Sequence, residues 1–385
     1  LVLHAGAKKV TIDGKAMTMG ILGLSGTGKT TTTFSKQGEL AQPIQDDMIV
    51  MWPDNTLTIT ENGCFAKTYG LTPESEPVLY AGSIHADAWV ENVFPNEDGT
   101  YDFSKGRLTP KEVARLKDML IQSGAPTDNV EAFISGKVKI DDVVNELDIP
   151  QDGWDFTVWS QNGRSIIPMK AIKDAASFDN IPPLKSLGIL NRDEGSEAAT
   201  PGIVRFPTPE LAAGYFMLGE TTKTSAAGKE RGKTRSPFTQ PFFTSPHGLQ
   251  AKRFSELAAK LGGLQTWMMN TGYVGGEARE EKQGKSIKVK IPHSSAMLQA
   301  MLSGKIKWMK DPDFGYEIVD INAPENADLL KKVPKEILNP KSYYESKGRM
   351  SEYTAWVEKM KKEREEFLNK FSVDPNIVKA VVCRC

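Results

Sequence analysis

The chain has 385 residues, of which 39% are hydrophobic and 25% are charged, and its formal net charge is −1. This composition is typical of a globular protein, and the length suffices for about two or three domains or one large domain with insertions. The balanced charge argues against a nonspecific nucleic-acid surface, and no apolar run approaches the ~20 residues of a membrane span. The three cysteines provide no disulfide framework, so we expect a reducing, cytoplasmic compartment.

The chain opens with a predicted β-hairpin that leads into a glycine-rich motif. Residues 10–12 and 16–19 flank the turn signal Asp13-Gly14-Lys15, and the apolar strand 16–22 runs directly into Gly23-Leu24-Ser25-Gly26-Thr27-Gly28-Lys29-Thr30. This run fits the pattern G-x-x-x-x-G-K-[ST], and residues 31–35 can begin a helix behind it. The sequence therefore predicts a P-loop. Its phosphate-binding residues would be Gly23, Ser25, Gly26, Thr27, Gly28, Lys29 and Thr30, with Mg²⁺ on the threonine hydroxyl.

An acidic pair follows the motif. Asp46 and Asp47 begin 17 residues beyond Lys29 and precede a predicted strand over 48–52. An aspartate at this place in a P-loop enzyme binds Mg²⁺ directly or through water, and its neighbour can hold a second metal or orient the first. A solvated acidic pair at a strand edge is the alternative.

The middle of the chain changes character. Residues 16–92 are predicted to be mostly β, with a further strand over 56–60. Between residues 95 and 153 the pattern becomes helical: Thr109 to Glu112 forms a capping box, and Val113, Leu116 and Leu120 share one face. We therefore predict a P-loop and metal-binding part over 1–94, a small inserted helical subdomain over 95–153, and the rest of the nucleotide domain over 154–385.

Strand character returns from about residue 156. The polar, glycine-bearing segment 219–234 is predicted to be a mobile loop, followed by a helix over 254–261 and a strand over 265–270. The last strong helix is predicted over 351–371, with Trp356 and Met360 on its apolar face. The charge run 359–366 is predicted to face solvent.

Several of these motifs together resemble the ATP-dependent phosphoenolpyruvate carboxykinase family. The P-loop reads Gly-Leu-Ser-Gly-Thr-Gly-Lys-Thr-Thr in both, and residues 61–67, Glu-Asn-Gly-Cys-Phe-Ala-Lys, are similar to the family's Glu-Gly-Gly-Cys-Tyr-Ala-Lys. Further matching segments follow in the family order at 71–77, 90–93, 228–232, 270–272, 337–340 and 343–344. The resemblance implies an α/β (α+β) fold, with a P-loop inside a mixed, mostly antiparallel β core and helices outside. It also implies that ATP phosphorylates decarboxylated oxaloacetate to give phosphoenolpyruvate.

The resemblance assigns catalytic and metal-binding roles residue by residue. Lys29 and Thr30 would bind the triphosphate and its Mg²⁺. His4 matches a metal-ligating histidine of the family and would share the catalytic divalent ion, usually Mn²⁺, with Asp47. Asp46 would support this catalytic centre.

Other roles concern the nucleotide and the transferred group. By resemblance, Lys67 would neutralise phosphate charge, and Glu76 would lie near the nucleotide. Arg164 resembles an arginine that stabilises charge on the phosphoryl group, although a structural salt bridge is the alternative. Ile287 and Ser294 would line the base pocket.

The chain also departs from the family pattern. Gln45 replaces a glycine before the aspartates, Met48-Ile49 replaces an acidic-histidine pair, and Ser286 replaces an arginine beside the adenine and phosphates. The family's substrate-binding arginine and tyrosine and its metal-ligating lysine precede the histidine, so we expect an upstream segment or partner chain to supply them. A P-loop kinase with another acceptor and a non-catalytic nucleotide-binding module remain alternatives.

Overall fold

The computed structural model describes residues 1–24, 27–34, 40–68, 70–93, 96, 98–101, 103, 110–138, 142–143, 151–154, 163–195, 198–223, 232–238 and 246–383. The chain divides into two compact units. Unit 1 comprises Leu1–Glu61, Ala176–Lys223 and Gly232–Cys385, and unit 2 comprises Asn62–Ala175 and Thr224–Arg231. These limits differ from the predicted boundaries at residues 94 and 153, and that three-part division stays a prediction.

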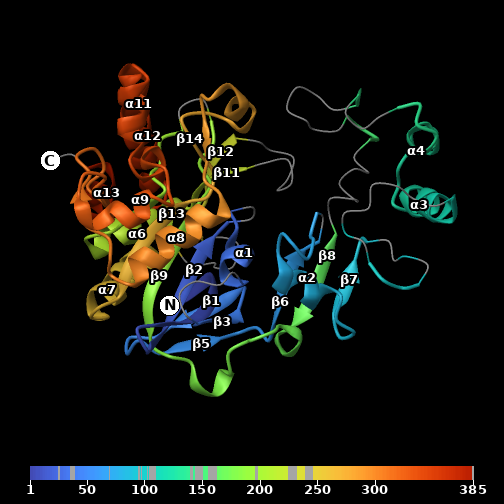
Figure 1. The fold of residues 1–385 in the computed structure, drawn as a ribbon, viewed down its shortest axis with the longest axis horizontal. Coiled ribbons are helices and arrows are strands. Elements are labelled where there is room, and N and C mark those ends of the chain that lie inside the picture. Colours follow the sequence, from blue (N-terminus) through green and yellow to red (C-terminus); the bar gives the residue numbers. More distant parts are fainter. Residues whose placement is uncertain are drawn as a thin grey trace. The chain divides into compact units, whose positions relative to one another are not determined.

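Unit 1 is built on a ten-stranded mixed sheet. Its strand order is β16-β17-β10-β13-β9-β2-β1-β4-β5, and β3 also pairs with β1. These strands are β1 (Val2–Ile12), β2 (Lys15–Gly23), β3 (Leu40–Gln45), β4 (Met48–Met51), β5 (Leu57–Ile59), β9 (Leu184–Asn191), β10 (Ile203–Arg205), β13 (Gln265–Asn270), β16 (Trp308–Lys310) and β17 (Glu317–Val319). In Figure 1, blue β1 and β2 lie beside green β9. The pairs β2–β9 and β9–β13 are parallel, and the other pairs are antiparallel.

The first hairpin confirms the sequence prediction. Ile12 pairs with Lys15, which leaves a two-residue turn, and both turn residues have positive φ, 49° at Asp13 and 74° at Gly14. Such a turn matches the twist of the strands that it connects, which is why an Asp-Gly pair is favoured there.

Helices cover both faces of the sheet because consecutive strand residues point to opposite sides. On β2, Leu22 packs into a cluster with side chains of α6, α7, α12 and α13, whereas Ile21 packs into a second cluster with α8, α9 and α10. The helices of unit 1 are α1 (Lys29–Phe34), α6 (Pro209–Leu218), α7 (His247–Lys260), α8 (Ile291–Leu302), α9 (Ala327–Leu330), α10 (Lys335–Leu338), α11 (Pro340–Ser346), α12 (Met350–Asn369) and α13 (Pro375–Val382). Short 3₁₀ helices lie at Phe178–Asn180, Ala278–Gln283 (η6) and Pro324–Asn326. Throughout the described parts of the chain, every helix lacks the combination of length and apolar character that crossing a bilayer requires.

Unit 2 contains a three-stranded antiparallel sheet in the order β6 (Gly63–Lys67), β8 (Arg164–Pro168) and β7 (Trp89–Glu91). The helix α2 (Pro77–Ser83) and a short 3₁₀ helix at Met169–Ala171 accompany it. Two further helices, α3 (Pro110–Gln122) and α4 (Thr127–Ile134), share a small core that includes Leu116, Leu120 and Val130. The helix predicted after residue 109 is therefore present.

Two predictions about the second half of the chain are wrong. The ends of the segment 219–234 are not loop: β11 (Glu220–Lys223) and β12 (Gly232–Arg235) pair as an antiparallel hairpin, while residues 224–231 lie outside the described residues. The charge run 359–366 does not uniformly face solvent, because Arg364 is 2% exposed. Its guanidinium donates a hydrogen bond to Glu220 at 2.8 Å, so the buried charge has a partner on the hairpin.

Candidate functional site

Three adjacent parallel strands, β2, β9 and β13, end at the same edge of the main sheet. Ligands of open α/β sheets bind outside the carboxyl ends of such strands. The predicted phosphate loop follows β2 at this edge and leads into α1. The strand–loop–helix context that the motif requires is therefore present.

Local geometry explains two of the loop glycines. A Cβ on Gly23 would overlap the Thr27 hydroxyl, which itself donates to the carbonyl of Leu24 at 2.8 Å. Gly28 has φ +89°, a conformation that L side chains rarely adopt. Ser25 and Gly26, two of the predicted phosphate contacts, lie outside the described residues.

The Lys29 ammonium lies among polar groups contributed by β1 and by the turn after β3. It is 3.0 Å from His4 Nε2, donates to the carbonyl of Asp46 at 2.8 Å, and is 3.9 Å from Asp47 Oδ1. Burial lowers the pKa of Lys29 more than the two neighbouring carboxylates raise it. A desolvated ammonium at the start of α1 is suited to contact a polyanion.

Asp46 lies beneath the first turn of α1. Its Oδ2 accepts a hydrogen bond from the Thr30 hydroxyl at 2.7 Å, and the side chain is buried. Its Oδ1 is also buried and accepts no hydrogen bond of good geometry from the described residues. Burial is the main cause that raises the pKa of Asp46 to about 6. The hydroxyls of Thr30 and Thr33 and the charge of Lys29 act in the opposite direction and favour the ionised carboxylate.

Asp47 and His4 form a close pair at the same edge. Asp47 Oδ1 lies 3.2 Å from His4 Nε2, and this hydrogen bond is the main cause that lowers the pKa of Asp47. Gln45, fully buried, donates to the carbonyl of Ala5 at 2.9 Å and accepts from the Asp47 amide at 2.6 Å. Gln45, which stands where the family has a glycine, thus holds the turn after β3 against β1. Sequence reasoning missed this role, although the position next to the aspartates was a signal.

The donor types at this edge suit a divalent cation. Hydroxyl and carboxylate oxygens are ligands that Mg²⁺ accepts, and an imidazole with carboxylates suits Mn²⁺. Asp46 Oδ1 is a buried acceptor that a cation could satisfy. Across the described ranges, however, no group of three or more His, Cys, Asp or Glu side chains is arranged to hold a metal ion. The metal roles of His4, Thr30 and Asp47 stay predictions.

Unit 2 brings together two of the predicted cationic residues. Lys67 on β6 and Arg164 on β8 are cross-strand partners. Burial and then the charge of Arg164 lower the pKa of Lys67. Arg164 donates to the carbonyl of Gly163 at 2.9 Å, and among the described residues no carboxylate lies within ion-pair distance of it. Glu76 precedes α2, where its carbonyl accepts from the Tyr80 amide. The predicted roles of these residues remain untested.

The predicted base-pocket residues lie beyond β13. β14 (Tyr273–Val274) pairs with β15 (Ile287–Lys288), and Ile287 is partly buried against both core clusters. Ser294 lies in the first turn of α8, where its amide donates to the carbonyl of Lys290. The assignment of Ile287 and Ser294 to a base pocket therefore stays a prediction.

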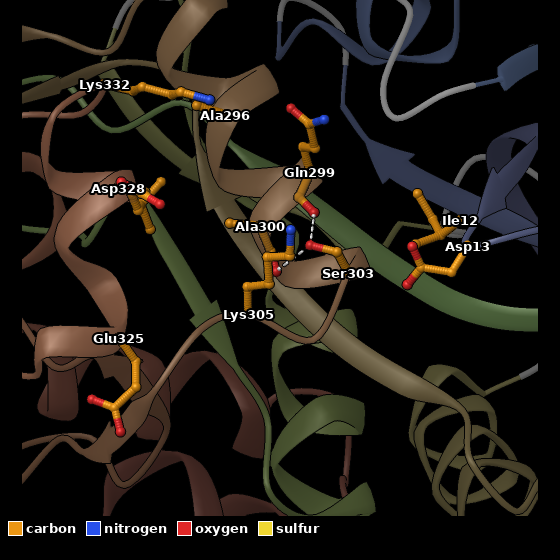
Figure 2. Close-up of a pocket in the computed structure, with 11 residues that line it drawn as sticks. Ile12, Asp13, Ala296, Gln299, Ala300, Ser303, Lys305, Glu325, Asp328 and Lys332 are labelled. Carbon is orange, nitrogen blue, oxygen red and sulfur yellow. Dashed lines mark hydrogen bonds between the residues drawn. The ribbon is translucent and has the colours of Figure 1, made fainter.

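A cavity of about 300 Å³ lies at the opposite edge of the sheet. Its lining includes Asp13, in the turn that precedes β2, and residues at the end of α8 (Figure 2). The Ser303 hydroxyl, which Figure 2 shows within it, donates to the carbonyls of Gln299 and Ala300 at 2.8 and 3.2 Å. The cavity is therefore separate from the phosphate-loop edge.

Known proteins with similar sequences share one description. The chain is 27% identical over 334 residues to phosphoenolpyruvate carboxykinase (ATP) of Thermus thermophilus, covering 84% of this chain and 49% of that protein. It is 26% identical over 374 residues to the enzyme of the same description from Aeropyrum pernix, covering 95% and 60%. It is 27% identical over 363 residues to the protein of the same description from Staphylococcus aureus, which covers 91% of this chain and 52% of that protein. The chain thus spans about half the length of these relatives.

The sequence profile of the phosphoenolpyruvate carboxykinase family matches residues 1–123 and 137–325. It leaves out residues 326–385 and, within the chain, the interval 124–136, which is shorter than the predicted insertion over 95–153. The match covers most of the chain, including the whole phosphate-loop edge and both strands that carry Lys67 and Arg164. The chain therefore belongs to the ATP-dependent phosphoenolpyruvate carboxykinase family.

Proposed function

We propose that the phosphate-loop edge binds ATP with Mg²⁺, and that the chain supplies this site to the conversion of oxaloacetate into phosphoenolpyruvate. The observation that carries the proposal is the gathering of Lys29, Thr30 and Asp46 at the carboxyl end of β2. Lys29 and Thr30 are neighbours in the motif, but Asp46 comes from the turn after a separate strand, β3. Family membership supports the choice of reaction.

In the proposed reaction the C–C bond of oxaloacetate breaks, CO₂ leaves, and the electron pair remains as an enolate. The enolate oxygen then forms a bond to the γ-phosphorus as the bond to ADP breaks. Charge develops on the transferred phosphoryl group, and fixed cations stabilise it. Lys29 donates to the Asp46 carbonyl and lies near His4 and Asp47, so its ammonium is positioned at this edge before a nucleotide binds.

We assign the other predicted roles on the same basis. Thr30 would hold Mg²⁺, His4 with Asp47 would hold Mn²⁺, and Asp46 would support this centre; the ions would supply charge neutralisation. Asp46 would also fix the Thr30 hydroxyl through the hydrogen bond that it accepts. The adjacent Lys67 and Arg164 form a cationic pair within unit 2 that suits an anionic substrate or phosphoryl group.

Isothermal titration of the chain with Mg·ATP tests the nucleotide site. Lys29→Ala should lose measurable binding, because the lysine of a P-loop contacts the β/γ-phosphates directly. Lys332→Ala, an exposed lysine at the opposite edge, is the matched control and should bind as the wild type does. Equal affinity of Lys29→Ala and wild type would refute the site.

A coupled assay for phosphoenolpyruvate with Mn²⁺ and Mg·ATP tests the reaction. The proposal expects activity from the chain together with the polypeptide that supplies the substrate-binding groups. ATP binding without phosphoenolpyruvate formation in that assembly would leave the nucleotide site intact and refute the proposed substrate.

A further inference from the structure

A lysine that the proposed function does not use lies on the other side of the phosphate loop. Lys288, on β15, is opposite Tyr273 of β14. Its ammonium donates to the carbonyl of Thr271 at 3.2 Å and lies 4.5 Å from the centre of the Tyr273 ring. Thr271 directly follows β13, and its hydroxyl donates to the carbonyl of Thr27 in the loop at 2.8 Å. One residue therefore links Lys288 to the loop backbone.

The charge of Lys288 is poorly compensated. The ammonium is partly buried and held by a carbonyl and an aromatic ring, and no carboxylate of the described residues lies within ion-pair distance. Arg192, which follows β9 at the same edge, adds a second positive charge and pairs with Glu194 at 2.9 Å. Burial and then Arg192 lower the pKa of Lys288 to about 8, although Glu194 and Glu281 act in the opposite direction. The Lys288 ammonium is thus partly desolvated and feels the charge of Arg192, and an anion bound to it would offset both effects.

Ser286 does not provide this charge, and its hydroxyl is directed elsewhere. The side chain is 3% exposed and donates to the carbonyl of Glu277 at 2.7 Å. Two residues later, on β15, Lys288 supplies a positive group instead.

We propose that Lys288, flanked by Arg192, binds a phosphate of the nucleotide that the Gly23–Thr30 loop holds. This inference rests on the proposed nucleotide site. Lys29 and its partners lie on the β1 side of the loop, whereas Arg192 follows β9 and Lys288 is bound to Thr271, which follows β13, on the other side. A phosphate chain on the loop is thus contacted from both sides. The ammonium, a compact point charge with three donors, suits a phosphate oxygen.

Isothermal titration with Mg·ATP and with Mg·tripolyphosphate tests the assignment. Lys288→Met should bind both ligands about 10- to 100-fold more weakly, the effect of one charge-assisted hydrogen bond. Lys282→Met, an exposed lysine on η6, is the matched control and should bind as the wild type does. A loss confined to ATP would place Lys288 on the nucleoside and overturn the phosphate assignment, as would unchanged affinity for both ligands.

A pH series separates a charge effect from a structural one. The affinity of wild type relative to Lys288→Arg should fall between pH 7 and pH 9, because the lysine loses its proton near pH 8 and the arginine does not. Arg192, Glu194, Glu281 and Tyr273 surround the amine in both proteins, so their titration cancels in the ratio. A constant ratio would overturn the inference. If wild type bound neither ligand, the proposed nucleotide site itself would fail; normal wild-type binding with an unaffected Lys288→Met would refute this inference alone.

Discussion

The buried ion pair between Arg364 of α12 and Glu220 of β11 predicts how much stability the chain loses when Arg364 is replaced. Arg364 donates to the two Glu220 carboxylate oxygens at 2.8 and 3.2 Å and to the Tyr215 hydroxyl at 3.1 Å. Its guanidinium carbon also lies 4.9 Å from the centre of the Phe314 ring. Replacing it by methionine leaves Glu220 buried and charged. Such a loss costs about 3–5 kcal/mol. The lower end applies here, because Arg235 still donates to Glu220 at 2.8 Å.

Urea denaturation followed by circular dichroism measures this cost. Arg364→Met should lower the free energy of unfolding by about 3 kcal/mol, whereas Lys362→Met, an exposed neighbour on α12, should stay within about 0.5 kcal/mol of wild type. The double variant Arg364→Met/Glu220→Gln should recover part of the loss, because it removes a buried charge that has lost one of its arginine partners. A loss below about 1 kcal/mol for Arg364→Met would refute the reasoning.

The same pair predicts a pH dependence. Although burial opposes ionisation, the combined effect of Arg364 and the other neighbouring cations lowers the pKa of Glu220. A carboxyl whose pKa is depressed on folding contributes stability above its unfolded value, and this contribution is lost as the pH falls. The stability advantage of wild type over Glu220→Gln should therefore be largest at neutral pH and should shrink below about pH 4. An advantage that stays constant from pH 7 to pH 3 would contradict this assignment.

Three further predictions concern residues of β1, of β3 and of the turn that follows β3. Burial lowers the pKa of Lys8 to about 7, so the folded chain releases a proton that the unfolded chain keeps. The stability of wild type relative to Lys8→Met should therefore rise by about 2 kcal/mol between pH 7 and pH 9 in urea titrations, and an unchanged difference would contradict it. Electron paramagnetic resonance should show a bound Mn²⁺ that disappears in both His4→Ala and Asp47→Asn; full affinity in either variant would exclude that residue as a ligand. Gln45→Ala should destabilise the chain by about 2 kcal/mol in thermal or urea unfolding, because it removes a buried hydrogen bond to the Ala5 carbonyl and a partly buried one from the Asp47 amide, and a neutral effect would refute that role.

The sequence by itself determined the features that depend on neighbours along the chain. The first hairpin follows from a two-residue turn, and the strand over 265–270 and the helix after residue 350 follow from local patterns; all three are present in the structure. The motif Gly23–Thr30 likewise lies between a strand and a helix that are adjacent to it along the chain. The family was also evident from sequence, because its motifs are short, local and ordered.

The tertiary structure alone decided which charged and polar side chains are buried. Arg364 lies in a charge run that is typical of a solvent-facing helix, but its partner Glu220 is 144 residues away. Lys288 similarly gains its position from Thr271, and Gln45 from Ala5 on another strand. A local pattern specifies backbone conformation through steric and hydrogen-bonding preferences of adjacent residues. The environment of a charge depends instead on segments that only the folded sheet brings together.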